Sequence, residues 1–196
     1  MNINDLKIVL ASASPRRKEL ISLISHNVTI RPAECDETLP EGIGAKEAVE
    51  LLSKIKNEAS KQISAKDELI ISADTVVSID NIILGKPVNK EDARRMIRLL
   101  SGKTHQVYTG VTLSFKSKSV TFSEKTDVTF FSLSEKEIED YVELENIYDK
   151  AGAYAIQGEA SLLVSGINGD YFNVVGLPVA RLNRELLKFI ENINLV

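Results

Sequence analysis

Residues 12–18 read Ser-Ala-Ser-Pro-Arg-Arg-Lys and join a short apolar run to the expected start of a helix. Ser14 is a favourable N-cap residue, and Pro15 suits the first helical position. Three cations in the first turn oppose the helix macrodipole, and a bound anion would remove that conflict. Free backbone N–H groups, hydroxyls and guanidinium groups together form a receptor for phosphate. The segment therefore predicts an anion site, with a solvated basic turn as the alternative.

Asp74 is the second candidate, because it lies in the apolar run of residues 69–77. A carboxylate in such a run is costly unless it is paired, hydrogen-bonded or bound to a metal. Either Asp74 is a site residue, or it is an exposed aspartate at a strand end or one held by a structural lysine. Glu34, Asp36 and Glu37 offer a second acidic group, although a solvated acidic loop is the default interpretation of such a run.

Lys86 lies between Gly85 and Pro87, so its backbone is constrained and its ammonium group could be aimed, although a surface lysine is the default. Cations suit a polyphosphate, and Mg²⁺ is usually bound by one or two carboxylates together with substrate phosphates. The combination of these groups predicts phosphate chemistry on a nucleotide.

The elements that must position these groups alternate between short apolar runs and longer amphipathic ones. Strands are expected at residues 8–11, 28–31, 69–79, 82–84, 106–115 and 119–131, and as glycine-punctuated pieces between 154 and 175. Helices are expected to begin after Ser14, near Ala45, after Asn89, after Ser134 and at Pro178. Hairpins mixed with helices favour a mixed α/β sheet over a fully parallel one.

The composition bounds the class of protein. The chain has 196 residues, 43% of them hydrophobic, with 28 acidic and 24 basic residues and a net charge of -4. This balance predicts one compact domain over residues 1–196 and argues against a general electrostatic grip on nucleic acid or on a membrane surface. A single cysteine, Cys35, fits a reducing compartment, and the first residues do not read as a targeting segment. We expect a soluble, cytoplasmic protein.

Several ordered blocks of the sequence also resemble a known family. The chain is similar over nearly its whole length to the Maf family of nucleoside triphosphate pyrophosphatases, once described as septum formation inhibitors. The blocks that carry the resemblance are residues 10–17 (LASASPRR) with Glu19-Leu20, 72–77 (SADTVV), 85–87 (GKP), 100–105 (LSGKTH), 149–154 (DKAGAY), 156–158 (IQG) and 176–178 (GLP).

The resemblance implies a mixed twisted sheet with flanking helices and two lobes around a central cleft, similar to inosine triphosphate pyrophosphatases. It also implies a homodimer that, with Mg²⁺ or Mn²⁺, hydrolyses a nucleoside triphosphate to the monophosphate and pyrophosphate. By position, Asp74 would be the proton acceptor or a metal ligand, and Glu37 the second metal-binding carboxylate. The residues that would hold the triphosphate are Ser12, Arg16, Arg17, Lys56 and Lys86.

Substrate choice is implied by three further positions. Arg16, Thr75 and Gln157 resemble the set associated in the family with dTTP and UTP, and the Gln157 amide suits the O4/N3 edge of uracil or thymine. Ala155 departs from the family pattern, which has glycine there. Modified pyrimidine nucleotides are possible substrates. The alternatives are a nucleotide-binding regulator of cell division with incidental hydrolysis, and a purine-directed house-cleaning hydrolase.

Overall fold

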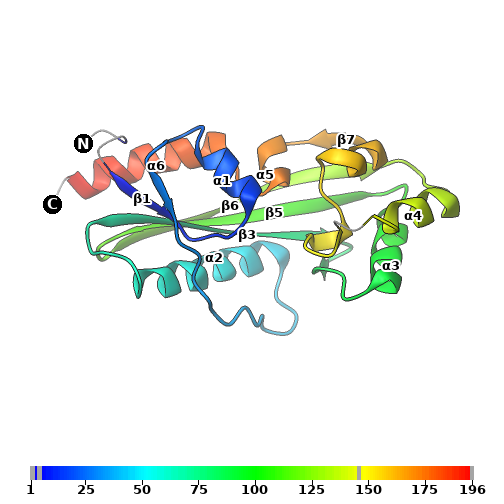
Figure 1. The fold of residues 1–196 in the computed structure, drawn as a ribbon, viewed down its shortest axis with the longest axis horizontal. Helices are drawn as coiled ribbons and strands as arrows, with labels where there is room; N and C mark the ends of the chain where they lie inside the picture. Colours follow the sequence, from blue (N-terminus) through cyan, green and yellow to red (C-terminus); the bar gives the residue numbers. More distant parts are fainter. Residues whose placement is uncertain (1–2, 4–5, 145–146, 195–196) are drawn as a thin grey trace.

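A mixed sheet forms the centre of the molecule (Figure 1). The computed structural model describes residue 3, residues 6–144 and residues 147–194. Within them the strand order is β2-β1-β3-β5-β6-β7, and β4 pairs with β3 outside this path. β1 is parallel to β2 and β3, whereas the remaining pairs are antiparallel, so the predicted mixed sheet is confirmed. The strands are β1 (Lys7–Leu10), β2 (Val28–Ile30), β3 (Glu68–Ile79), β4 (Ile82–Leu84), β5 (Thr104–Phe115), β6 (Lys118–Phe130) and β7 (Val164–Asn168).

The helices begin where the capping residues predict. The hydroxyl of Ser14 accepts the N–H of Arg17, and Ser134 forms a full capping box with Glu137. Asn89 likewise caps its helix. The helices are α1 (Pro15–Ile21), α2 (Ala45–Lys61), α3 (Lys90–Leu100), α4 (Glu135–Val142), α5 (Tyr171–Val175) and α6 (Val179–Asn194), with 3₁₀ turns η3 (Ala151–Ala153) and η4 (Gly158–Leu163). None of the helices in this part of the chain is long and apolar enough to cross a membrane.

The segment between Tyr154 and Val175 differs from the expectation of several strands. It contains one strand, β7, between the 3₁₀ turn η4 and the short helix α5. Asp170 explains part of the difference, because its carboxylate accepts the N–H of Phe172 and so starts α5 locally. The hairpin predicted at Asp80-Asn81 is confirmed, with φ of 50° and 63°, as a two-residue hairpin turn of this kind requires.

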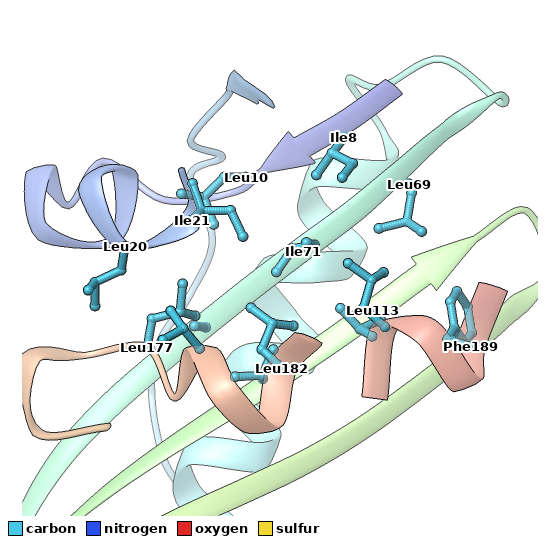
Figure 2. Close-up of a cluster of buried hydrophobic side chains, with 14 of the residues drawn as sticks. Ile8, Leu10, Leu20, Ile21, Leu69, Ile71, Leu113, Leu177, Leu182 and Phe189 are labelled. Carbon is cyan, nitrogen blue, oxygen red and sulfur yellow. The ribbon is translucent and has the colours of Figure 1, made fainter. Parts of the chain in front are cut away.

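Helices cover both faces of the sheet: α2 lies on one face, and α1, α5 and α6 lie on the other (Figure 1). The buried side chains form two large clusters. Figure 2 shows the first, in which Ile71 and Leu113 of the sheet pack with Leu182 and Phe189 of α6. The second cluster lies around α3 and α4. Since β3, β5 and β6 contribute to both clusters, these strands run through the whole molecule.

One stretch of β3 has a strand partner on one side only. β1 pairs with β3 as far as Ile71, and β4 pairs with β3 from Val77 onward, whereas β5 pairs with β3 from Ile70 to Ser78. Within the described residues, positions 72–76 therefore face a gap in the sheet. Asp74 lies at the centre of this stretch.

Candidate active site

A pocket of about 710 Å³ opens at the gap in the sheet. Ile156 and Val175 of the first hydrophobic cluster and Val77 and Leu84 of the second line its walls, so the cleft lies between two lobes as expected. The structure brings together in this one pocket every residue predicted to act on the substrate or metal: Ser12, Arg16, Arg17, Glu37, Lys56, Asp74, Thr75, Lys86 and Gln157. Their individual roles stay predictions.

Asp74 points from β3 toward α2, where its carboxylate accepts a short hydrogen bond from Lys56. The close approach of α2 depends on Gly110, which pairs with Asp74 across the β3–β5 ladder. A Cβ at position 110 would lie 2.2 Å from the backbone oxygen of Val49 in α2. The missing side chain thus lets α2 pack close enough for Lys56 to reach Asp74. Both interpretations of Asp74 meet here, since it is held by a lysine and lines the pocket.

Lys56 also contacts the second predicted carboxylate. Its Nζ lies 2.9 Å from Oε2 of Glu37, whose side chain is 54% exposed, whereas those of Lys56 and Asp74 are 16% and 12% exposed. Burial lowers the pKa of Lys56, but the two carboxylates outweigh burial, so the net pKa is raised. Two carboxylates therefore converge on one cationic position.

This donor set fits a hard divalent cation. Mg²⁺ and Mn²⁺ take oxygen ligands and are commonly held by one or two carboxylates with phosphate oxygens. In the described part of the chain no group of three or more His, Cys, Asp or Glu side chains is placed to hold a metal. A metal at Asp74 and Glu37 would accordingly need oxygen ligands from a phosphate-bearing substrate or from water.

Arg17 is engaged mainly by the protein itself. Its Nε donates to the carbonyl of Gly176 at 2.9 Å, Nη1 to the carbonyl of Ala73 at 2.8 Å and to Ser12 Oγ at 3.3 Å, and Nη2 to Thr75 Oγ1 at 3.0 Å. Because a guanidinium has five N–H donors, these bonds leave one for a ligand. Arg17 therefore connects α1 to β3 and to the turn after α5. This structural role is not evident from its sequence context.

The remaining cations are placed differently. Arg16 is half-buried at the start of α1, and Lys86 is exposed after β4. Both line the pocket that also contains Asp74. Arg16 and Lys86 therefore bring positive charge to the pocket in addition to the one N–H that Arg17 has left for a ligand.

Gln157 lies at the N-cap position of η4, where its side chain forms no capping hydrogen bond. The alternative interpretation, a turn glutamine bonded to backbone, is not seen at this cap. Ala155 also lines the pocket and is not among the residues with positive φ, so the turn here does not require glycine.

Two groups behind the pocket were not predicted as functional. Thr109 of β5 contacts Thr75, with 2.9 Å between the two Oγ1 atoms, and donates to the carbonyl of Asn173 at 3.0 Å. His105 is fully buried, and its Nε2 lies 2.6 Å from the hydroxyl of Tyr154, a pocket residue. Burial lowers the pKa of His105 to about 4, so the ring is neutral. The threonine-rich sequence of β5, THQVYTGVTLSF, is the signal that hydroxyls lie along this strand.

The fold and the pocket define a mixed α/β protein whose cleft sets cationic side chains against two carboxylates. The chain belongs to the family described as Maf-like protein, whose model matches residues 7–189. It is 49% identical over 183 residues to a Bacillus cereus protein named dTTP/UTP pyrophosphatase, with 93% of this chain and 95% of the relative covered. A Bacillus mycoides protein of the same name is 48% identical over 188 residues, covering 93% of this chain and 95% of that relative.

Two solved structures also align with the chain. One is a nucleoside-triphosphatase, dITP/XTP pyrophosphatase, from Mycobacterium abscessus, with a TM-score of 0.48, 12% identity and coverage of 96% of this chain and 98% of that chain. The other is the Staphylococcus aureus Ham1 protein, with a TM-score of 0.46, 14% identity and coverage of 63% and 71%.

Proposed function

We propose that the protein is a nucleoside triphosphate pyrophosphatase that hydrolyses dTTP and UTP to the monophosphate and pyrophosphate. The observation that carries the proposal is the convergence of Asp74, Glu37 and the cationic side chains on one pocket. The names of the Bacillus relatives, which align over 93% of this chain, support the choice of pyrimidine substrates.

In this proposal the triphosphate lies among Ser12, Arg16 and Lys86, with Lys56 close to the carboxylates. The positive charges of Arg16, Lys56 and Lys86 and the hydroxyl of Ser12 stabilise the charge that develops on the phosphates during hydrolysis. Arg17 contributes its remaining N–H and otherwise keeps Ser12 and Thr75 in position. The negatively charged triphosphate also becomes an additional ionic partner of the Lys56 ammonium.

Asp74 is proposed as the group that accepts the proton of the attacking water or that orients this water by holding the metal. Its place on a central strand fixes the carboxylate in direction. The divalent cation would be held by Asp74 and Glu37 and, when bound, would supply Lewis-acid activation and charge neutralisation.

The decisive assay measures pyrophosphate release from dTTP and UTP by the purified protein with Mg²⁺ or Mn²⁺. Asp74→Asn should abolish release while retaining nucleotide binding, because the amide keeps the shape but cannot accept the proton. The matched control is Asp127→Asn, which changes an aspartate of β6 that pairs with Lys125 and does not line the pocket. An active Asp74→Asn protein would contradict the proposal.

A substrate panel completes the test. dTTP, UTP, a 5-methylated UTP, 7-methyl-GTP and ITP offered side by side would identify the preferred base. Equal turnover of the purine nucleotides would contradict a pyrimidine enzyme. We further propose a cytoplasmic homodimer, a state that size-exclusion chromatography with light scattering would test.

A further inference from the structure

A chain of buried hydroxyl groups leads away from the pocket. Arg17 Nη2 donates to Thr75 Oγ1, which is 2.9 Å from Thr109 Oγ1. Thr109 in turn donates to the backbone carbonyl of Asn173 at 3.0 Å. Thr109 and Asn173 are both fully buried, whereas Thr75 is partly exposed at the pocket wall.

Asn173 is held firmly at the end of this chain. Its Nδ2 donates to the carbonyl of Val107 and to Thr126 Oγ1, both at 3.0 Å. Its backbone carbonyl also accepts the N–H of Gly176. The acceptor that faces Thr109 is therefore fixed in place by bonds to two strands and by the turn after α5.

The directions of these hydrogen bonds follow from counting protons. A threonine hydroxyl has one hydrogen and two lone pairs, and a carbonyl oxygen can only accept. Thr109 uses its hydrogen on Asn173, so Thr75 must supply the hydrogen between the two threonines. Thr75 also accepts one bond from Arg17, and what remains toward the pocket is a single lone pair.

We propose that Thr109, oriented by the Asn173 carbonyl, is a positioning residue that fixes Thr75 as a hydrogen-bond acceptor and so selects a nucleotide base bearing a ring N–H. The proposal rests on the function proposed above and deepens it. Uracil and thymine carry a hydrogen on ring N3, whereas cytosine presents a lone pair there. A site whose buried polar groups match one partner rejects the partner that leaves them unpaired.

The side chains of Asp74 and Thr75 point to opposite sides of β3. Successive side chains of a strand point to opposite faces. Asp74 points to Lys56 on α2, so Thr75 points to the other face, toward Arg17 and Thr109. The Thr75 hydroxyl therefore lies away from the pair of carboxylates.

The test is Thr109→Val, which removes the hydroxyl with little change of shape. The hydrogen of Thr75 then loses its acceptor and becomes free to turn into the pocket. The ratio of kcat/KM for UTP to that for CTP should fall about tenfold, the factor carried by one ordinary hydrogen bond. The change should be mainly in KM, since the bond is made in the bound substrate as well as in the transition state.

Two variants separate positioning from simple packing. Thr109→Ser keeps the hydroxyl and should retain the wild-type ratio. Thr112→Val makes the same substitution at another buried threonine of β5, whose hydroxyl contacts Ser53 and Thr121 and which does not line the pocket. It should also retain the ratio, even if it lowers stability.

Binding supplies a second readout that does not need turnover. Calorimetry with the α,β-methylene analogues of UTP and CTP measures the same discrimination in wild type and in Thr109→Val. An unchanged UTP to CTP ratio in Thr109→Val would overturn the proposal. A variant in which the UTP to dUTP ratio shifts while the UTP to CTP ratio does not would overturn it as well. A wild-type protein that binds the UTP analogue selectively but releases no pyrophosphate would reject the proposed function and leave this inference standing.

Discussion

Lys56 is the cation between the two pocket carboxylates. Replacing it with methionine tests how much its charge stabilises the protein when no metal is bound. Methionine keeps much of the aliphatic stem but removes the charge. Asp74, 12% exposed, then lies beside Glu37 without its counterion. Breaking a buried pair costs about 3–5 kcal/mol, and the opening of the pocket to water lowers our expectation to about 2–3 kcal/mol. For a chain of this size, that is a fall in Tm of about 4–12 °C.

The assay is thermal unfolding of Lys56→Met with and without Mn²⁺. A divalent ion can occupy the position that the ammonium leaves, so Mn²⁺ should raise the Tm of the variant more than that of wild type. Lys61→Met on the same helix is the control, because Lys61 pairs with the exposed Glu58 and should contribute little. Adding Asp74→Asn to Lys56→Met should recover part of the lost stability. If Lys56→Met is as stable as Lys61→Met, the reasoning about the carboxylates is refuted.

Three other substitutions test features around the site. Burial lowers the pKa of His105 from 6.5 to about 4, so the unfolded chain takes up the proton first as pH falls. Between pH 7 and 4.5, the unfolding free energy of wild type should therefore fall by about 2.5 kcal/mol more than that of His105→Gln, as measured by denaturant titrations. Gly110→Ala should destabilise by more than about 3 kcal/mol through its clash with α2, whereas Gly166→Ala, with open space around it, should not; calorimetry compares them. In Arg17→Lys the ammonium cannot reproduce the several hydrogen bonds of the guanidinium, so the free energy of unfolding should fall by about 2 kcal/mol and kcat/KM should also fall. Wild-type values of both quantities would show that these hydrogen bonds are dispensable.

Local signals in the sequence were sufficient for most of the elements. Ser14, Asn89 and Ser134 are caps whose side chains bond to their own helices, so their effect is visible in a few residues. The region of η4 and α5 was harder, because its conformation depends on short-range turns and on packing against distant strands. Glycine and short apolar runs there suit strands and 3₁₀ turns alike.

The site residues were named correctly as pocket residues, but their connections were not. Lys56 and Glu37 lie outside the ordered blocks and were assigned by position from the resemblance, because residue type alone would have left them on a helix surface and in a loop. No sequence signal indicated that Arg17 spends four donors on the protein, or that Thr109 lies behind Thr75. Apart from the bond between Arg17 and Ser12, these bonds join positions 34–159 residues apart, and their register is set only when the sheet assembles.

The gap beside residues 72–76 has a mechanical consequence. The pocket interrupts the sheet on one side of β3, yet β3, β5 and β6 continue without a break from one hydrophobic cluster to the other. The two lobes are thus joined by long strands, and no loop hinge separates them there. Closure around a ligand would have to proceed by a change in strand twist, a stiff motion of small amplitude. A protease that cuts surface loops should consequently leave the two halves of the cleft attached and aligned.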